Sequence, residues 1–329
     1  MMDDKWIHMQ EEPFSRLDAR ERAIALCNRR AFTELAGPRI KLASPHLPVM
    51  GQTPQFDDGI VVGLGRIGKV PAVVVSQDSR FMGGGIGEVN GTKMVMAIHL
   101  AYRGQKILKS QGAYCAAGTG ARVVLVISFD TGGVRLQEAN AGLLAHSEVM
   151  DAFEEVRGKV PIIGLIGGTV GCFGGMGFVA SSVDVLIMSD VGRLGLTGPG
   201  VIEEVVGTEE FDAANRALVW RTTGGRHRFI MRDADFIVED SMKAFREKIL
   251  EVTGWPKEKI GSARIIGSKE TVKEQMRLVE LAAEDKVQDS WDLWRQFGNE
   301  DIDGLWDACV SEFRQHARRW PRGRDGGCD

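Results

Sequence analysis

Three glycine-rich stretches, each placed between a run of apolar residues and a helical pattern, constrain this fold more than any other feature. They read SQDSRFMGGGIGE, SFDTGGVRLQE and GTVGCFGGMG. The apolar runs around them, such as ARVVLVISFD, VPIIGLIGG and VDVLIMSD, show no polar alternation, which is typical of strands buried on both faces. Strands that alternate with crossover helices predict an α/β protein with a largely parallel sheet.

The remaining pattern predicts the order of the elements. A hairpin is expected at Gly68-Lys69 between two β-type runs, and helices are expected over residues 15–35, 88–109 and 135–156. A short Gly-rich helix is expected after VPIIGLIGG, and the strand patterns stop at about residue 240. We therefore divide the chain into a domain over 1–240, a helical extension over 241–320 and a disordered tail over 321–329.

The extension is predicted from its apolar periodicity. Steps of three and four residues predict one amphipathic helix over 268–298, with a capping box at Thr271 and Glu274 and an end at Gly298. A second helix would bury Ile302, Trp306, Cys309 and Phe313. Two interpretations stay open, because this pair of helices either packs on its own domain or docks a partner subunit.

Composition excludes several classes of protein. The net charge is -4 and there is no basic stripe, so neither nucleic acid nor an anionic membrane surface is an expected partner. No apolar run is long enough to span a membrane, and the polar, acidic N-terminal segment is no signal peptide. The five cysteines form no CxxC pair, which argues against a zinc ribbon or other metal site and suits a reducing cytoplasm.

The segment GLGRIG matches the dinucleotide-binding fingerprint, but its context argues against that function. The fingerprint requires a helix directly after the glycines, whose N-terminus meets the pyrophosphate. Here KVPAVVVSQD follows, and Pro71 with a β-branched run predicts a returning strand. We interpret Gly63, Gly65 and Gly68 as turn residues and reject an NAD-dependent dehydrogenase, provided that residues 70–76 form a strand.

The three glycine-rich turns should lie together, because the carboxyl ends of parallel strands share one edge of the sheet. One such turn is explained by close packing of a helix on a strand, whereas three on one edge favour a site. Helix N-termini present free N–H groups and the positive end of a dipole. Glycine lets a ligand oxygen reach those groups, so the sequence predicts a site that stabilises an oxyanion.

The motifs GGGIGE, DTGGVRLQEAN and GGTVGCFGGMG resemble those of the acyl-CoA carboxyltransferases, whose related motif reads SGGARxQEG. The β subunits of biotin-independent malonate decarboxylases are the most similar, because SPHLPVMGQTPQFDDGIVVG, GEVNGTK and RLGLTGPGVIEEVVGTEEFDAANRALVWRTTGG also match them. The similarity runs from about Phe14 to Asp240. It implies a crotonase-like (ClpP/crotonase) carboxyltransferase half, to which the C-terminal helices are an extension.

The resemblance also implies roles for individual residues. The amides of Gly174 and Gly175 would hold the thioester oxygen, and the loop of Gly83 and Gly84 would offer the other oxyanion donor. The remaining motif residues would bind substrate along the acyl and pantetheine channel: Gly85, Gly132, Gly133, Arg135, Gln137 and Glu138. For Arg135, Gln137 and Glu138 a second interpretation stays open, namely ion pairs at the start of their own helix.

The implied activity is decarboxylation of a malonyl thioester on an acyl carrier protein, through an enolate, to the acetyl thioester. This chain holds one crotonase-like half, so a γ subunit should supply the other half, and carrier-protein and transferase subunits should complete a cytoplasmic complex. No cofactor need be bound by this chain, since the carrier protein brings its own CoA-like arm.

Several points stay open on the sequence. No proton donor is identified, because His99 and His146 lie in helical patterns that suit packing, and Cys172 is either a buried filler or a nucleophile. A biotin-dependent carboxyltransferase subunit shares the fold and most site residues. Some of its relatives carry a four-cysteine zinc ribbon that this chain lacks, which favours the decarboxylase. A non-catalytic scaffold for the γ subunit is the third alternative.

Overall fold

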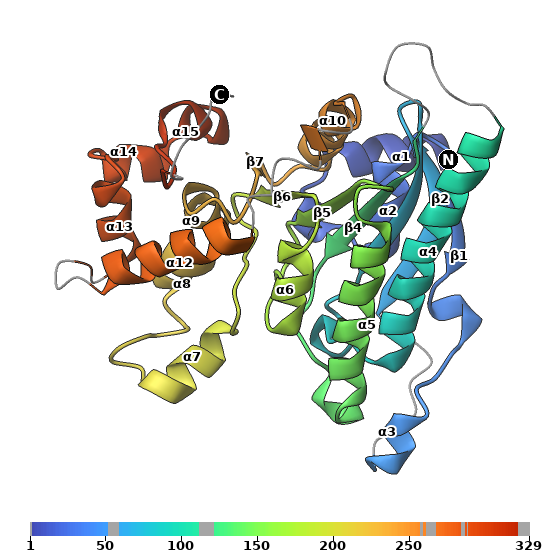
Figure 1. Ribbon diagram of the computed structural model, residues 1–329, viewed down its shortest axis with the longest axis horizontal. Coiled ribbons are helices and arrows are strands. Elements are labelled where there is room, and N and C mark those ends of the chain that lie inside the picture. The colour runs from blue at the N-terminus through green and yellow to red at the C-terminus, as the bar shows by residue number, and fades with distance from the viewer. Residues whose placement is uncertain are drawn as a thin grey trace.

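The centre of the molecule is a seven-stranded sheet whose strand order follows the chain (Figure 1). This computed structural model describes residues 2–51, 59–111, 122–256, 259–260, 268–283, 287 and 289–321, without the side chains of 2–4 and 268–271. The strands are β1 Thr33–Ala36, β2 Ile60–Ile67, β3 Val70–Gln77, β4 Val124–Phe129, β5 Ile162–Ile166, β6 Val185–Ser189 and β7 Phe236–Val238. Pairing from β3 to β7 is parallel, as predicted, and β1, β2 and β3 pair antiparallel.

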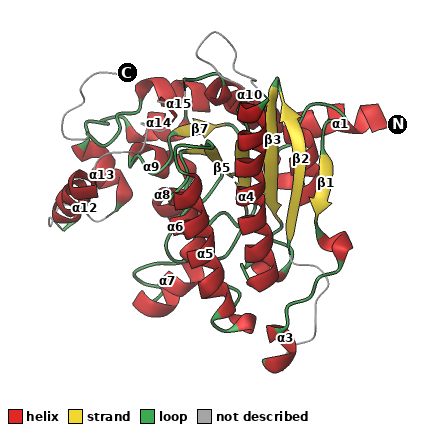
Figure 2. Ribbon diagram, turned by 45° about the vertical axis from the view of Figure 1, so that its right-hand side comes forward, coloured by secondary structure: helices red, strands yellow, loops and turns green. Residues whose placement is uncertain are grey.

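Two layers of helices cover the sheet (Figure 2). On one face lie α4 Glu88–Ser110, α5 Ala141–Val156 and α6 Gly175–Ser181, whose core includes Ile98, Phe153 and Val179. On the other face lie α1 Met2–Glu11, α2 Ala19–Leu26 and α10 Met242–Thr253, with a core around Phe14 and Phe245. Burial on both faces explains why β4, β5 and β6 are apolar throughout.

Short elements connect these layers. They are the 3-10 turns η1 Phe14–Arg16, η2 Pro38–Ile40, η3 Met82–Gly84 and η4 Leu136–Glu138, and the helices α3 His46–Val49, α7 Pro199–Val206, α8 Arg216–Thr223 and α9 Gly225–Ile230. In the parts of the chain described, no helix is both long and apolar enough to cross a membrane.

The predicted hairpin is confirmed. Ile67 pairs with Val70 across the two-residue turn Gly68-Lys69, and Gly68 adopts φ +57°, a value that glycine reaches without a steric penalty. Residues 70–76 therefore form a strand, and the condition for rejecting the dehydrogenase is met.

The predicted first helix over 15–35 is too long. Helix α2 starts at a capping box between Asp18 and Glu21 and ends at Leu26. The side chain of Asn28 then hydrogen-bonds both the N–H and the carbonyl of Gly68, at 2.9 and 2.7 Å. Arg30 takes a positive φ, so the chain turns here and continues as strand β1. These contacts join segments 40 residues apart and leave no periodic signal in the sequence.

The predicted helices of the C-terminal region are each divided. Instead of one helix over 268–298 there are α12 Ser268–Ala282 and α13 Ser290–Gln296, which Asp289 caps by accepting from the Trp291 N–H at 2.7 Å. Because α12 starts at Ser268, Thr271 lies inside the helix rather than at its N-cap. Gly298 follows α13 with φ +89°, as an end signal should.

The second predicted helix is α14 Ile302–Asp307 followed by α15 Val310–His316. Ile302 and Phe313 are buried as expected, in a cluster with Trp294, whereas Cys309 lies exposed between the two helices. This cluster also contains Phe229 and Ile230 of α9, so these helices pack on their own chain. By contrast, Val272, Met276 and Val279 on α12 stay 58–68% exposed.

The division at residue 240 remains a prediction. Helix α10, assigned to the extension, buries Met242, Phe245 and Ile249 in the core beneath the sheet. The cluster of α13 to α15 forms a separate core beside it. Residues 52–58, within a segment that carries the resemblance, and residues 322–329, within the predicted tail, lie outside the described part of the chain.

Candidate functional site

The structure brings the three glycine-rich turns together at the carboxyl edge of the sheet. Single β-bridges join Ile86 to Val134 and Thr131 to Cys172, so each turn is paired with the next. The Gly132 N–H donates to the Gly83 carbonyl at 2.9 Å, and the Phe173 N–H donates to the Thr131 carbonyl at 3.0 Å. The site is therefore built on backbone contacts among three loops.

The N–H groups of Gly174 and Gly175 are unbonded within the described structure. Gly174 is the N-cap of α6, with φ +62° and ψ -147°, a conformation that a side chain would strain. A Cβ there would lie 3.2 Å from the Cα of Gly133. The two turns thus approach each other through bare backbone, and both amides keep their hydrogen-bonding capacity.

Sequence reasoning missed a third unbonded amide, that of Val134. The Ile86 N–H donates to the Gly133 carbonyl, and the Arg135 N–H donates to the Ile86 carbonyl. The Val134 N–H itself has no partner among the residues described. Val134 follows Gly133, which faces Gly174. Its signal in the sequence was its place directly after a glycine pair at the end of a strand.

The Gly83–Gly85 loop offers fewer donors than expected. The Gly84 N–H donates to the Phe81 carbonyl at 2.9 Å and the Gly85 N–H donates to the Met82 carbonyl at 3.2 Å. Of the predicted pair of donors, only Gly83 keeps an N–H without a described partner, and the space where its side chain would point is open. The Gly84 N–H is therefore occupied in this structure, and the role of the Gly83–Gly84 loop as an oxyanion donor stays a prediction.

Arg135 and Glu138 form a buried ion pair, with Nη1 and Oε1 2.6 Å apart. Arg135 also donates to the Gly85 carbonyl, and Glu138 accepts from the Ser44 hydroxyl and the Glu88 N–H. Burial raises the pKa of Glu138, but these hydrogen bonds outweigh it and leave the pKa below its usual value. The pair ties the glycine turns together, which agrees with the ion-pair interpretation.

The other residues predicted to bind substrate differ in whether their polar groups are free to do so. Gln137 is exposed. The Gly132 and Gly133 amides are occupied, by the Gly83 carbonyl and by the Thr131 hydroxyl at 3.1 Å. A role for any of these residues in substrate binding stays a prediction.

Asp130, which directly follows β4, connects the loop after β3 with the loop after β5. One carboxylate oxygen accepts from Arg22 Nη2 and from the Ser79 hydroxyl, each at 2.8 Å. The other accepts from the Val170 N–H at 3.0 Å. Asp130 and Arg22 are almost fully buried. The pair therefore fixes the loop that leads to Gly174, and no sequence pattern predicted it.

His146 of α5 lies against the start of α6. A Cβ on Gly175 would come within 2.8 Å of its Nε2 atom. The imidazole is 6% exposed and neither ring nitrogen makes a hydrogen bond within the described structure. Burial lowers the pKa of His146, which the nearby Gly142 carbonyl offsets only in part. His146 thus lies, with its charged form disfavoured by burial, beside the Gly174–Gly175 turn.

Cys172 is no nucleophile in this arrangement. Its thiol is fully buried and donates to the Met176 carbonyl at 3.2 Å. Burial raises the pKa of Cys172 far above its usual value, so the reactive thiolate is disfavoured. Across the described residues, no three His, Cys, Asp or Glu side chains gather as metal ligands would.

Comparison with known proteins identifies related chains. Residues 10–247 match the carboxyl transferase domain family. A malonyl-S-ACP:biotin-protein carboxyltransferase of Malonomonas rubra is 51% identical over 96% of this chain and 98% of its own length. The propionyl-CoA carboxylase β chain of Saccharopolyspora erythraea is 30% identical over 66% of this chain, but over only 36% of its own length.

Among solved structures, a chain of a Pseudomonas malonate decarboxylase hetero-tetramer in complex with malonate has a TM-score of 0.72 and 32% identity. The similarity covers 87% of this chain and 98% of that one. These similarities confirm the predicted carboxyltransferase-type, crotonase-like fold with its C-terminal helices. They also confirm the resemblance to malonate decarboxylase subunits.

Proposed function

This chain belongs to the carboxyl transferase domain family, and from that premise we propose that it removes the carboxyl group of a malonyl thioester held on an acyl carrier protein. One observation carries the proposal. The unbonded amides of Gly174, Gly175 and Val134 lie on two turns whose backbones approach each other closely, at Gly133 and Gly174, at the carboxyl edge of the sheet.

Decarboxylation requires a group that stabilises the electron pair left by the broken carbon–carbon bond. When the bond between C2 and the carboxylate breaks, its electrons move into an enolate whose negative charge rests on the thioester oxygen. Fixed N–H donors stabilise that charge, and loss of one donor typically costs about 2.7–4 kcal/mol of transition-state stabilisation. Gly83 is a further candidate donor from the neighbouring loop.

The carboxyl group, in this proposal, passes to biotin on a separate biotin protein. C2 of the enolate takes the proton that the ureido nitrogen loses, so malonyl thioester and biotin become acetyl thioester and carboxybiotin. The 51% identical carboxyltransferase of Malonomonas rubra supports this acceptor. Biotin is then a substrate presented by a partner, and this chain binds no cofactor of its own.

Biotin-independent release of CO2 is the second candidate. The structural similarity to a Pseudomonas malonate decarboxylase, over nearly the whole length of that chain, favours it. Both candidates share the enolate step and differ only in what receives the carboxyl group and what protonates C2.

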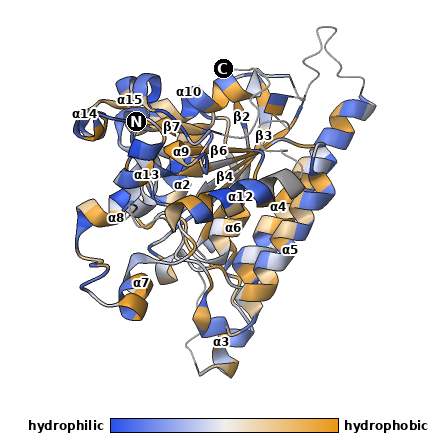
Figure 3. Ribbon diagram, turned by 60° about the vertical axis from the view of Figure 1, so that its left-hand side comes forward, coloured by the Kyte–Doolittle hydropathy of each residue, from blue (hydrophilic) through white to orange (hydrophobic). Residues whose placement is uncertain are grey.

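Partner subunits belong to the proposal in either case. The expected partners are a γ-type subunit that contributes the second crotonase-like half, the acyl carrier protein and its transferase. Exposed apolar side chains on α5 and α6, namely Leu143, Leu144 and Phe178, offer surface for such a subunit. Figure 3 shows hydrophobic residues along α5 and on α7.

The test uses malonyl carrier protein labelled in its free carboxyl group, the complete set of subunits, and the biotin protein added or withheld. We expect label on biotin, and inhibition by avidin. Release of labelled CO2 without the biotin protein, unaffected by avidin, would instead establish the biotin-independent reaction. Failure of the complete complex to consume malonyl thioester would refute both.

A further inference from the structure

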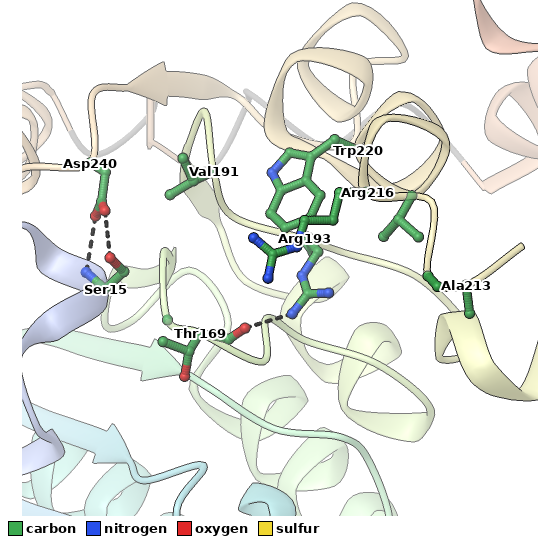
Figure 4. A pocket seen from close by; sticks show the side chains of 11 residues that line it. Ser15, Thr169, Val191, Arg193, Ala213, Arg216, Trp220 and Asp240 are labelled. Carbon is green, nitrogen blue, oxygen red and sulfur yellow. Dashed lines mark hydrogen bonds between the residues drawn. The ribbon is translucent and has the colours of Figure 1, made fainter.

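A second feature of the carboxyl edge is a cavity of about 620 Å³ that no part of the proposed mechanism uses. It lies where β5, β6 and β7 end, and it opens beside the loop that leads to Gly174. Its polar lining consists of Ser15, Thr169, Arg193, Arg216, Trp220 and Asp240 (Figure 4).

Two arginines face this cavity together. Figure 4 shows the guanidinium groups of Arg193 and Arg216 beside the Trp220 ring. The Arg193 guanidinium carbon lies 5.0 Å from the centre of that ring, and its Nη2 atom donates to the Thr169 carbonyl at 2.5 Å. The indole and the carbonyl therefore hold one guanidinium in a fixed position while leaving it further donors.

The described lining of this cavity carries two arginines and one aspartate, so its net charge is positive. Neither Arg193 nor Arg216 forms an ion pair with a described carboxylate. Asp240, across the cavity, already accepts from the Ser15 N–H and hydroxyl, at 2.9 and 2.5 Å. Asp130 is occupied by Arg22. Arg193 is half-buried and its neighbour Arg216 is exposed, and two adjacent like charges favour an anion between them.

The charges around Arg193 also favour a bound anion. Burial lowers the pKa of Arg193, Asp130 raises it and the neighbouring Arg216 lowers it, and the net effect is downward. A bound anion would relieve both the burial cost and the repulsion. Guanidinium groups match carboxylate and phosphate oxygens through two parallel N–H bonds.

The cavity is tied to the oxyanion turn. The Cys172 N–H donates to the Arg193 carbonyl at 2.8 Å, and the Arg193 guanidinium carbon lies 5.9 Å from the centre of the Phe173 ring. From these contacts we infer that Arg193 and Arg216 form a binding site for an oxyanionic group, a carboxylate or a phosphate. That the group belongs to the malonyl unit or to the phosphate of the carrier arm rests on the proposed function.

The experiment measures binding, not turnover. Isothermal titration of the full-length chain would use malonate, inorganic phosphate and pantetheine 4′-phosphate as probes. We expect Arg193→Met and Arg216→Met each to weaken binding about tenfold or more, and Arg193→Lys to restore part of it. Arg103→Met, on the exposed surface of α4, is the matched control and should bind as the unaltered protein does.

The probes distinguish a carboxylate of the malonyl unit from a phosphate of the carrier arm. Binding of malonate alone assigns a carboxylate, and binding of the phosphate probes alone assigns the carrier arm. The inference is overturned if no probe binds at millimolar concentration, or if the variants, shown to be folded by their melting temperatures, bind as tightly as the control. Arginine-dependent binding in a protein without malonyl-thioester activity would refute the proposed function and leave this site standing.

Discussion

Gly175 shows how one missing side chain serves the proposed chemistry. Its N–H is unbonded, and its Cα faces the His146 ring so closely that a methyl group has no room. We expect Gly175→Ala to push the turn aside and reduce kcat about 100-fold, since one displaced oxyanion donor typically costs that much. Steady-state kinetics on malonyl carrier protein measure the loss.

Two variants make this prediction specific. Adding His146→Ala should restore part of the rate, because it removes the atoms that the new methyl group meets. Gly200→Ala on α7, where a Cβ meets nothing within 4 Å, should leave the rate unchanged. A Gly175→Ala enzyme that retains full activity would remove this amide from the mechanism and favour a scaffold role for the chain.

At the scale of elements, Asp130 follows β4 and joins the loops after β3 and β5 through Ser79 and Val170. It also joins the sheet to α2 through Arg22. Asp130→Ala would leave Arg22 buried without its counter-charge. We expect the free energy of unfolding to fall by about 3–5 kcal/mol, as it does when one partner of a buried ion pair is removed. Urea denaturation followed by circular dichroism provides the measurement.

The matched control is Glu154→Ala, which breaks the ion pair with Arg157 on the surface of α5. An exposed pair contributes only about 0–1 kcal/mol, so this variant should be nearly neutral. Equal losses for Asp130→Ala and Glu154→Ala would contradict the special position of Asp130. A double variant of Asp130 and Arg22 with apolar replacements should recover part of the stability, because no buried charge then remains unpaired.

At the scale of the whole molecule, buried histidines should set the stability in acid. Burial lowers the pKa of His146 and, more strongly, of His227, whose Nδ1 accepts from the Trp294 Nε1–H at 3.1 Å. Below the ordinary value of 6.5 the unfolded chain therefore binds protons that the folded chain does not. The free energy of unfolding should fall in that range by up to about 1.4 kcal/mol per pH unit for each histidine.

Urea denaturation between pH 7.5 and 5 tests this slope. His227→Gln and His146→Gln should each flatten the curve, and the double variant should flatten it most. Glu138, whose pKa is also lowered, adds a loss only at lower pH, as the pH falls below the usual value of 4.5 toward its folded pKa. A wild-type curve that stays level down to pH 5 would show that these histidines titrate in the folded protein as in the unfolded chain.

The periodic elements and their order could be read from the sequence. Continuous apolar runs predict β4, β5 and β6, because strands buried on both faces need no polar alternation. The hairpin at Gly68 and the glycine-rich start of α6 follow from backbone conformations that glycine adopts most easily. The glycine-rich turns also predicted the candidate site, because a backbone amide that no side chain covers is indicated by glycine alone.

Tertiary contacts between distant residues decided the rest. Asn28 ends α2 through Gly68, Asp130 meets Arg22, and His146 meets Gly175. The residues of each pair are far apart in the sequence and close only in the folded chain, so local periodicity does not predict their contact. The same holds for Gly84, whose N–H donates to the Phe81 carbonyl, and for Arg193 and Arg216, which come together only where the loop after β6 meets the start of α8. The sequence determined where bare amides occur, and only the folded chain decided which of them stay free.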